Sequence, residues 1–170
     1  MSTPVQAQEV NVYSGRQEAL IKPLLDKFTE QSGIKVNLVA GQGDALLSRI
    51  KAEGMFTPAD LLIVADIGRL VRAEQLGITQ TIDASVLSQL DAQWQDDNGQ
   101  WLALTKRARP VMVKKGFDVS RISTLEDLTK PEFANKICIR SSSNIYNQSM
   151  TSALIVQQGE DATLAWAKDL

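Results

Sequence analysis

The sequence predicts an α/β fold built on layered, parallel sheet structure, and three observations predict it. Strand-like and helix-like patterns alternate from residue 9 to residue 76, which is the order of an α/β sheet with right-handed crossovers. The run Ala59–Val64 is almost entirely apolar, as in a strand that is buried on both faces. Glycines follow the expected helices and mark where they end.

The first half of the chain supplies three strands, each followed by a helix. Residues 9–13 alternate polar and apolar side chains, which is typical of a strand. Pro23 suits the first turn of the next helix, and Asp44 is a suitable cap for the second. The remaining elements are strands over residues 35–40 and 59–64 and a helix over residues 67–75.

The second half repeats these patterns less regularly. Its expected strands cover residues 101–105, 109–113 and 136–140, and its expected helices cover residues 83–90, 124–128, 144–158 and 160–170. Cys138 lies between two isoleucines, so we expect it to pack in a core. Because no strand follows the last helix, we expect the second sheet to be unfinished and the chain to be a fragment.

Composition limits the function. The net charge is −2 at pH 7, whereas a nucleic-acid binder would show a basic patch. No apolar run approaches the eighteen or so residues that a membrane span requires. The chain has no histidine and one cysteine, so a metal would be held by oxygen ligands. This favours a hard cation such as ferric iron, magnesium or calcium.

The first eight residues lack the charged start and apolar stretch of a signal peptide. Residues 5–7, Val-Gln-Ala, resemble the end of a cleavage site, which indicates an exported protein whose signal is replaced by an initiator Met. An ordinary disordered tail explains the same residues equally well. Under either interpretation, residues 1–8 are expected to be a disordered remnant.

The segment from Ile139 to Asn147 is the most informative for chemistry. An expected strand delivers Ser141, Ser142 and Ser143 to the start of a helix, where free N–H groups favour an anion or a polar ligand. Tyr146 lies in the first turn of that helix, and a phenolate oxygen is a hard metal ligand. The alternative is an ordinary helix cap beside a tyrosine that only packs.

Two further groups could contribute to a site. Arg107 and Arg109 are two residues apart on an expected strand, so they face the same side and could hold an anion. A solvated basic pair is the alternative. Gln17 and Asp66 follow expected strands at the edge where α/β sheets bind ligands. A glycine turn at Gln17 and a helix cap at Asp66 are the structural alternatives.

Four segments in order resemble the ferric-iron-binding periplasmic proteins that serve ABC importers. They are Val12-Tyr-Ser-Gly-Arg-Gln-Glu18 with Pro23-Leu-Leu and Phe28–Val36, Pro58–Val64, Leu104-Thr-Lys-Arg-Ala-Arg109, and Lys136–Ser149. The resemblance covers essentially all of residues 9–170. It implies an α/β fold of the periplasmic-binding-protein type II class, with two lobes that close over the ligand. The first lobe would span residues 9–107, and residues 108–170 would form part of the second.

The resemblance also implies roles for individual residues. Tyr146 matches an iron-ligand tyrosine, and Arg107 and Arg109 match the basic step that holds a synergistic anion such as carbonate or bicarbonate. The serines at 141–143 match the loop lining the cleft. Gln17 replaces a histidine ligand of some members, which suggests the subgroup that binds iron through tyrosines and an anion.

The sequence departs from the family because it has no pair of adjacent tyrosines, which members carry further along the chain. We therefore expect this chain to bind Fe3+ weakly by itself. The implied location is the periplasm and the implied partner is an inner-membrane ABC permease. The unfinished sheet could also pair with a second copy, as a homodimer or a domain swap.

Two other interpretations remain open, and a third is disfavoured. The same fold could carry another solute, such as phosphate or sulfate. The chain could be an inactive truncated domain. An enzyme using Asp66 as a base is disfavoured, because the sequence has no histidine, no paired-carboxylate motif and no nucleophile motif.

Overall fold

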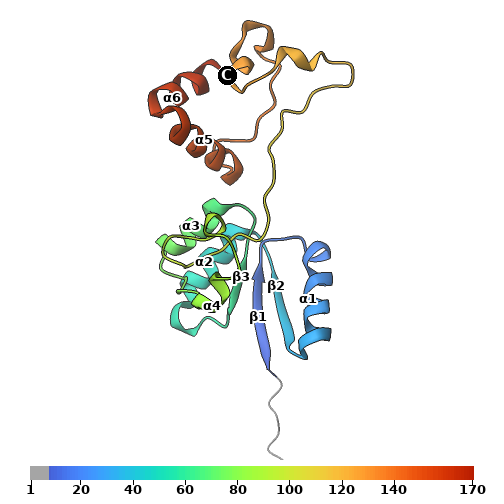
Figure 1. The fold of residues 1–170 in the computed structure, drawn as a ribbon, viewed down its shortest axis with the longest axis vertical. Coiled ribbons are helices and arrows are strands. Elements are labelled where there is room, and N and C mark those ends of the chain that lie inside the picture. The colour runs from blue at the N-terminus through green and yellow to red at the C-terminus, as the bar shows by residue number, and fades with distance from the viewer. Residues whose placement is uncertain (1–7) are drawn as a thin grey trace, which may run out of the picture. The chain divides into compact units, whose positions relative to one another are not determined.

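The computed structural model of the chain describes residues 8–170 and divides into two compact units. Unit 1 ends at Ala103 and unit 2 covers Leu104–Leu170 (Figure 1). The proposed lobe boundary after residue 107 falls in the extended segment that follows this division. The expected disordered remnant at residues 1–8 lies outside the described residues, apart from Gln8.

Unit 1 is built on a parallel three-stranded sheet. Its strands are β1 (Glu9–Ser14), β2 (Lys35–Ala40) and β3 (Leu61–Ile63), in the order β2-β1-β3. Val12 of the central strand is paired with Leu38 on one side and with Leu61 on the other. The expectation that the apolar run is buried on both faces is wrong. The reason is that β3 lies at the edge of the sheet, where Leu61 is 52% exposed.

The helices of unit 1 are α1 (Glu18–Ser32), α2 (Gly43–Glu53), α3 (Ile67–Gln75) and the short α4 (Ala84–Leu87). Figure 1 shows α1 on one side of the strands and α2 with α3 on the other. The predicted helix at 67–75 is confirmed, whereas of the one expected at 83–90 only residues 84–87 form a helix.

Two expected helix starts are wrong. Helix α1 begins at Glu18, so Pro23 lies inside it rather than in its first turn. Proline lacks an N–H, and it therefore leaves the carbonyl four residues earlier without its helical partner. Asp44 is not the cap of α2, because the helix begins at Gly43 and follows Gln42. Its carboxylate instead pairs with two arginines of α3.

The core of unit 1 forms where β1 meets α2. Tyr13, Leu46 and Ile50 are buried together. The Tyr13 hydroxyl lies 3.2 Å from Oε1 of Glu53, to which it donates a hydrogen bond. Burial, followed by this hydrogen bond, raises the pKa of Tyr13 above its usual value of 10.0. This residue is a structural tyrosine that ties the central strand to the end of α2.

Residues 104–170, all of which the structure describes, contain helices and extended segments but no strand. The strands expected at 109–113 and 136–140 are therefore wrong. That expected at 101–105 is reduced to one antiparallel bridge between Leu102 and Gln95. The apolar residues of these segments fit a sheet, but a strand also needs a hydrogen-bonded neighbour. Without one, Cys138 is exposed rather than packed in a core.

Unit 2 has a small core between its last two helices and a preceding loop. Helix α5 (Ile145–Gln158) is capped by Gly159, and α6 (Glu160–Asp169) follows at once, so the helices expected over 144–158 and 160–170 are confirmed. Trp166 is buried, and its indole N–H donates to the carbonyl oxygen of Leu125 at 3.0 Å. Short 3-10 turns cover the rest, including Val119–Arg121, Glu126–Thr129 and Pro131–Phe133. The expected helix at 124–128 is one of these turns.

Candidate functional site

Tyr146 is held at the start of α5 by the residue that caps the helix. The Asn144 side-chain oxygen accepts a hydrogen bond from the backbone N–H of Tyr146 at 3.0 Å. The serine loop precedes this cap, and Ser141 and Ser143 share a hydrogen bond of 2.9 Å between their hydroxyls. All three serines are exposed. A half-buried tyrosine thus lies three residues after a row of accessible hydroxyl groups.

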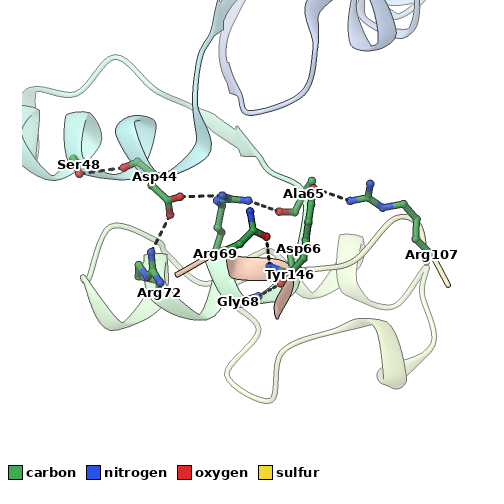
Figure 2. A network of polar contacts seen from close by, with 10 residues as sticks. Asp44, Ser48, Ala65, Asp66, Gly68, Arg69, Arg72, Arg107 and Tyr146 are labelled. Atoms are coloured by element: carbon green, nitrogen blue, oxygen red, sulfur yellow. Dashed lines mark hydrogen bonds and ion pairs between the residues drawn. The ribbon is translucent and has the colours of Figure 1, made fainter. Parts of the chain in front are cut away.

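Three arginines surround the ring of Tyr146. The guanidinium carbons of Arg107 and Arg109 lie 5.4 and 5.6 Å from the ring centroid, and that of Arg140 lies 5.2 Å away. Arg107 also donates to the phenolic oxygen at 3.4 Å, as Figure 2 shows. The predicted partners Arg107, Arg109 and Tyr146 are therefore brought together. The nearby guanidinium groups concentrate positive charge around one phenol, and such a concentration of positive charge attracts anions.

Arg140 was missed from the sequence. It precedes the serine loop directly, and its carbonyl oxygen accepts a hydrogen bond from the Asn147 side chain at 2.8 Å. The position of Arg140 in the sequence was the signal that could have placed it in the site. A basic residue immediately before a hydroxyl-rich helix start lies close to the first turn of that helix. The strand expected over residues 136–140 gave Arg140 no part in the site, because it treated this residue as the end of a sheet strand.

A hollow of about 310 Å³ lies along the first turns of α5. Every side chain around it is polar and uncharged: Ser142, Asn147, Gln148, Thr151 and Ser152. Such groups donate and accept hydrogen bonds without adding charge. The hollow shares Ser142 with the serine loop, so the hydroxyl groups near Tyr146 continue into a space of small-molecule size.

Gln17 and Asp66 belong to unit 1. Gln17 is exposed and precedes α1 at the carboxyl end of β1, and its side chain makes no capping hydrogen bond. Asp66 caps α3, because its carboxylate accepts a hydrogen bond from the N–H of Gly68 at 3.1 Å. The φ angle of Asp66 is 84°, a strained value for a residue other than glycine. Both residues lie at the sheet edge where they were expected, and their role in binding stays a prediction.

A second charged network lies at the same edge of unit 1 (Figure 2). Asp44 accepts hydrogen bonds from Arg69 and Arg72, each at 2.9 Å. The hydrogen bond from Arg69 holds the pKa of the Asp44 carboxyl below its usual 3.8. Arg69 Nε is buried without a hydrogen-bond partner among the described residues. A side chain at Gly43 would come within 2.7 Å of that atom. The charges of this network are paired within unit 1, which indicates a structural role.

Over residues 8–170, no group of three or more histidine, cysteine or acidic residues is placed to hold a metal ion. No helix in the same residues is long and apolar enough to cross a membrane. A metal site in the described part of the chain would therefore need other oxygen groups, of which the Tyr146 phenol is one.

Comparison with known proteins identifies clear relatives. A family model described as bacterial extracellular solute-binding protein matches residues 10–169. Iron uptake protein A1 of Synechocystis sp. is 45% identical over 168 residues, which are 98% of this chain and 47% of that protein. The Fe(3+)-binding periplasmic protein of Serratia marcescens is 31% identical over 163 residues, 95% of this chain and 48% of that protein.

Solved structures agree with these relatives. A Trichodesmium protein (IdiA, FutA) in complex with iron and citrate ligands has a TM-score of 0.87 and 43% identity, over 95% of this chain and 52% of that one. The ferric binding protein from Campylobacter jejuni has a TM-score of 0.83 and 33% identity, over 94% and 52%. The predicted α/β fold of the periplasmic-binding-protein type II class is confirmed. The chain spans about half the length of the curated relatives it matches.

Proposed function

Because the chain belongs to the family of bacterial extracellular solute-binding proteins, we propose that it binds ferric iron in the periplasm for delivery to an ABC importer. The relatives described above are named for iron uptake or ferric-iron binding. Within this proposal the chain is a binding protein and not an enzyme, and its partner is the permease of the importer.

The observation that carries this proposal is the arrangement around Tyr146. Its hydroxyl is a hard oxygen ligand of the kind that ferric iron prefers. The three arginines around the ring would repel a bare cation, but they would hold an anion that binds together with the iron. Iron and anion are therefore expected to bind as a pair, and neither is expected to bind strongly without the other.

The other predicted residues take supporting roles. Arg107 and Arg109 would each donate two hydrogen bonds to the anion, which we propose to be carbonate or bicarbonate. The Ser141, Ser142 and Ser143 hydroxyls would donate further hydrogen bonds to the same anion oxygens. A binding role for Gln17 and Asp66, which belong to unit 1, stays a separate prediction. The Trichodesmium relative is described in complex with iron and citrate, which supports an anion that binds together with the iron, although that anion is not carbonate.

A visible absorption titration tests the proposal. The purified chain is titrated with chelated ferric iron in the presence of bicarbonate, and a broad phenolate-to-iron charge-transfer band should saturate at a defined ratio. The chain has only two tyrosines, so the matched variants are few. Tyr146→Phe should abolish the band, and Tyr13→Phe should retain it because Tyr13 is buried.

Two results would count against this function. A Tyr146→Phe chain that keeps both colour and affinity would remove Tyr146 as the ligand. A wild-type chain that shows no band at any iron concentration would contradict iron binding by this chain.

The cluster of three arginines also favours a second candidate function, which is the binding of a free oxyanion such as phosphate or sulfate. Calorimetric titration with phosphate in the absence of iron separates the two. Tight phosphate binding that iron does not enhance would favour the oxyanion carrier.

A further inference from the structure

We propose that Asn147 is a positioning residue, whose side chain closes the serine loop and holds Arg140 beside Tyr146 before any ligand binds. The inference rests on the function proposed above, because it adds to the anion site of unit 2 a residue that shapes it. Asn147 would act through Arg140, while Tyr146 remains the residue that contacts the iron.

The first support is a hydrogen bond that spans the loop. The Asn147 side-chain N–H donates to the carbonyl oxygen of Arg140 at 2.8 Å, across seven positions of sequence. Arg140 directly precedes the three serines, and Asn147 lies in the first turn of α5. The bond therefore joins the two ends of the loop. Among the described residues, no other hydrogen bond ties the backbone of Arg140 to α5.

The second support is that the inside of the loop is ordered by other contacts. The backbone N–H of Asn144 donates to the Ser141 carbonyl oxygen at 2.9 Å, and the Ser141 and Ser143 hydroxyls share a further hydrogen bond. These contacts shape the turn from Ser141 to Asn144, but they leave the preceding residue, Arg140, unattached. The Asn147 side chain supplies the missing attachment.

The third support is the side chain that the attached backbone carries. The guanidinium carbon of Arg140 lies 5.2 Å from the centroid of the Tyr146 ring. An arginine side chain loses much rotamer freedom when it is held in one place, so a fixed backbone reduces what remains to be ordered. Because Asn147 follows Tyr146 directly and holds the Arg140 carbonyl, it sets the point from which this side chain reaches the ring. Groups that are in place beforehand lose less conformational freedom when a ligand binds.

Asn147 is itself held firmly enough to position its neighbours. Its backbone N–H donates to the Asn144 carbonyl oxygen at 2.9 Å, and its carbonyl oxygen accepts a hydrogen bond from the Thr151 hydroxyl at 2.9 Å. Its side chain is half-buried. A residue bonded through both backbone groups and through its side chain is a rigid point of attachment for the loop.

The first test needs no iron. The chain is produced with fluorotyrosine, so that its two tyrosines give separate fluorine NMR signals, which Tyr146→Phe assigns. Asn147→Leu keeps the approximate size of the side chain and removes its donor. The Tyr146 signal should then move toward its position in the unfolded chain, because Arg140 no longer stays beside the ring, and the Tyr13 signal should not move. Asn147→Gln keeps an amide donor and should restore most of the wild-type signal.

The second test repeats the titration with chelated ferric iron and bicarbonate. Asn147→Leu should need roughly three- to tenfold more iron to reach half of the final band, as expected for the loss of one hydrogen bond that orders the site. The matched control is Gln148→Leu, the next residue on α5, which borders the same hollow and whose side chain has no hydrogen-bond partner in the described part of the chain. It should change the midpoint by less than about twofold.

The outcomes separate this inference from the function on which it rests. An Asn147→Leu chain that is less stable but keeps the wild-type Tyr146 signal would show a structural bond only, and it overturns the positioning role. Equal effects of Asn147→Leu and Gln148→Leu on that signal overturn it as well. If the wild-type chain gives no iron band, ferric-iron binding is rejected, and the fluorine signals alone decide whether Asn147 positions Arg140.

Discussion

Tyr13 in unit 1 and Tyr146 in unit 2 both have an arginine against the ring, yet they have different surroundings. Arg49 lies 4.9 Å from the Tyr13 ring centroid, and the same arginine pairs with Glu53, which accepts the hydrogen bond of the Tyr13 hydroxyl. Positive and negative groups therefore balance each other. Around Tyr146 the structure provides three arginines. The difference lies in the number of cations at each ring: one arginine, paired with a carboxylate, lies against Tyr13, whereas three arginines gather around Tyr146.

The largest effect expected from this comparison concerns stability. Tyr13→Ala removes a buried ring from the core of unit 1, and such changes cost about 3–5 kcal/mol. Tyr146→Ala removes a half-buried ring and should cost less than about 1 kcal/mol. Urea unfolding followed by circular dichroism measures both. Equal losses in the two variants would mean that Tyr146 is also a core residue.

A smaller effect is expected at the helix that carries Tyr146. Asn144→Ala removes the side-chain oxygen that caps α5, and the loss of a cap costs about 1 kcal/mol. The first turn of α5 should fray, which would weaken anion binding more than it weakens the fold. Hydrogen exchange at the Tyr146 amide measures the fraying. Asn144→Asp retains a capping oxygen and serves as the control, and fraying of similar extent in it would refute the capping role.

The smallest expected effect is a pH dependence in unit 2. Hydrogen bonds from Lys130 and from the backbone N–H groups of Ser123 and Thr124 lower the pKa of Asp127 to about 2. A lowered carboxyl pKa adds stability above the usual value of 3.8, and this contribution is lost as the pH falls from about 4 through 2. Asp127→Asn should therefore be less stable than the wild type at pH 5 and nearly equal to it at pH 2. Urea midpoints at both pH values decide this, and a constant difference would contradict it.

Unit 1 could be predicted from the sequence because its signals are local. Alternating and apolar runs mark strands, and Gly33 and Gly54 end helices in backbone conformations that suit glycine. The start of α1 was predicted too late because a proline in the first turn of a helix and a proline one turn later have similar neighbours in the sequence. The packing of α1 beside β2 tolerates the lost hydrogen bond.

The extended segments of unit 2 could not be predicted in the same way. Residues 109–113 and 136–140 have the composition of strands, but a strand also depends on a neighbour that composition does not reveal. The site shows the same limit. Tyr146, Arg107 and Arg109 were placed together through resemblance to a family, whereas the closeness of Arg140 depends on a three-dimensional turn around Asn147.

The contact between Gly43 and Arg69 limits how this sequence can change over evolutionary time. An alanine at position 43 would place its methyl group 2.7 Å from Nε and 2.8 Å from Cδ of Arg69, in the middle of a side chain held at its far end by Ala65 and Asp44. A shorter residue at position 69 removes that obstacle. The order of substitution is therefore constrained: the arginine must be replaced before the glycine, and the reverse order passes through a destabilised intermediate.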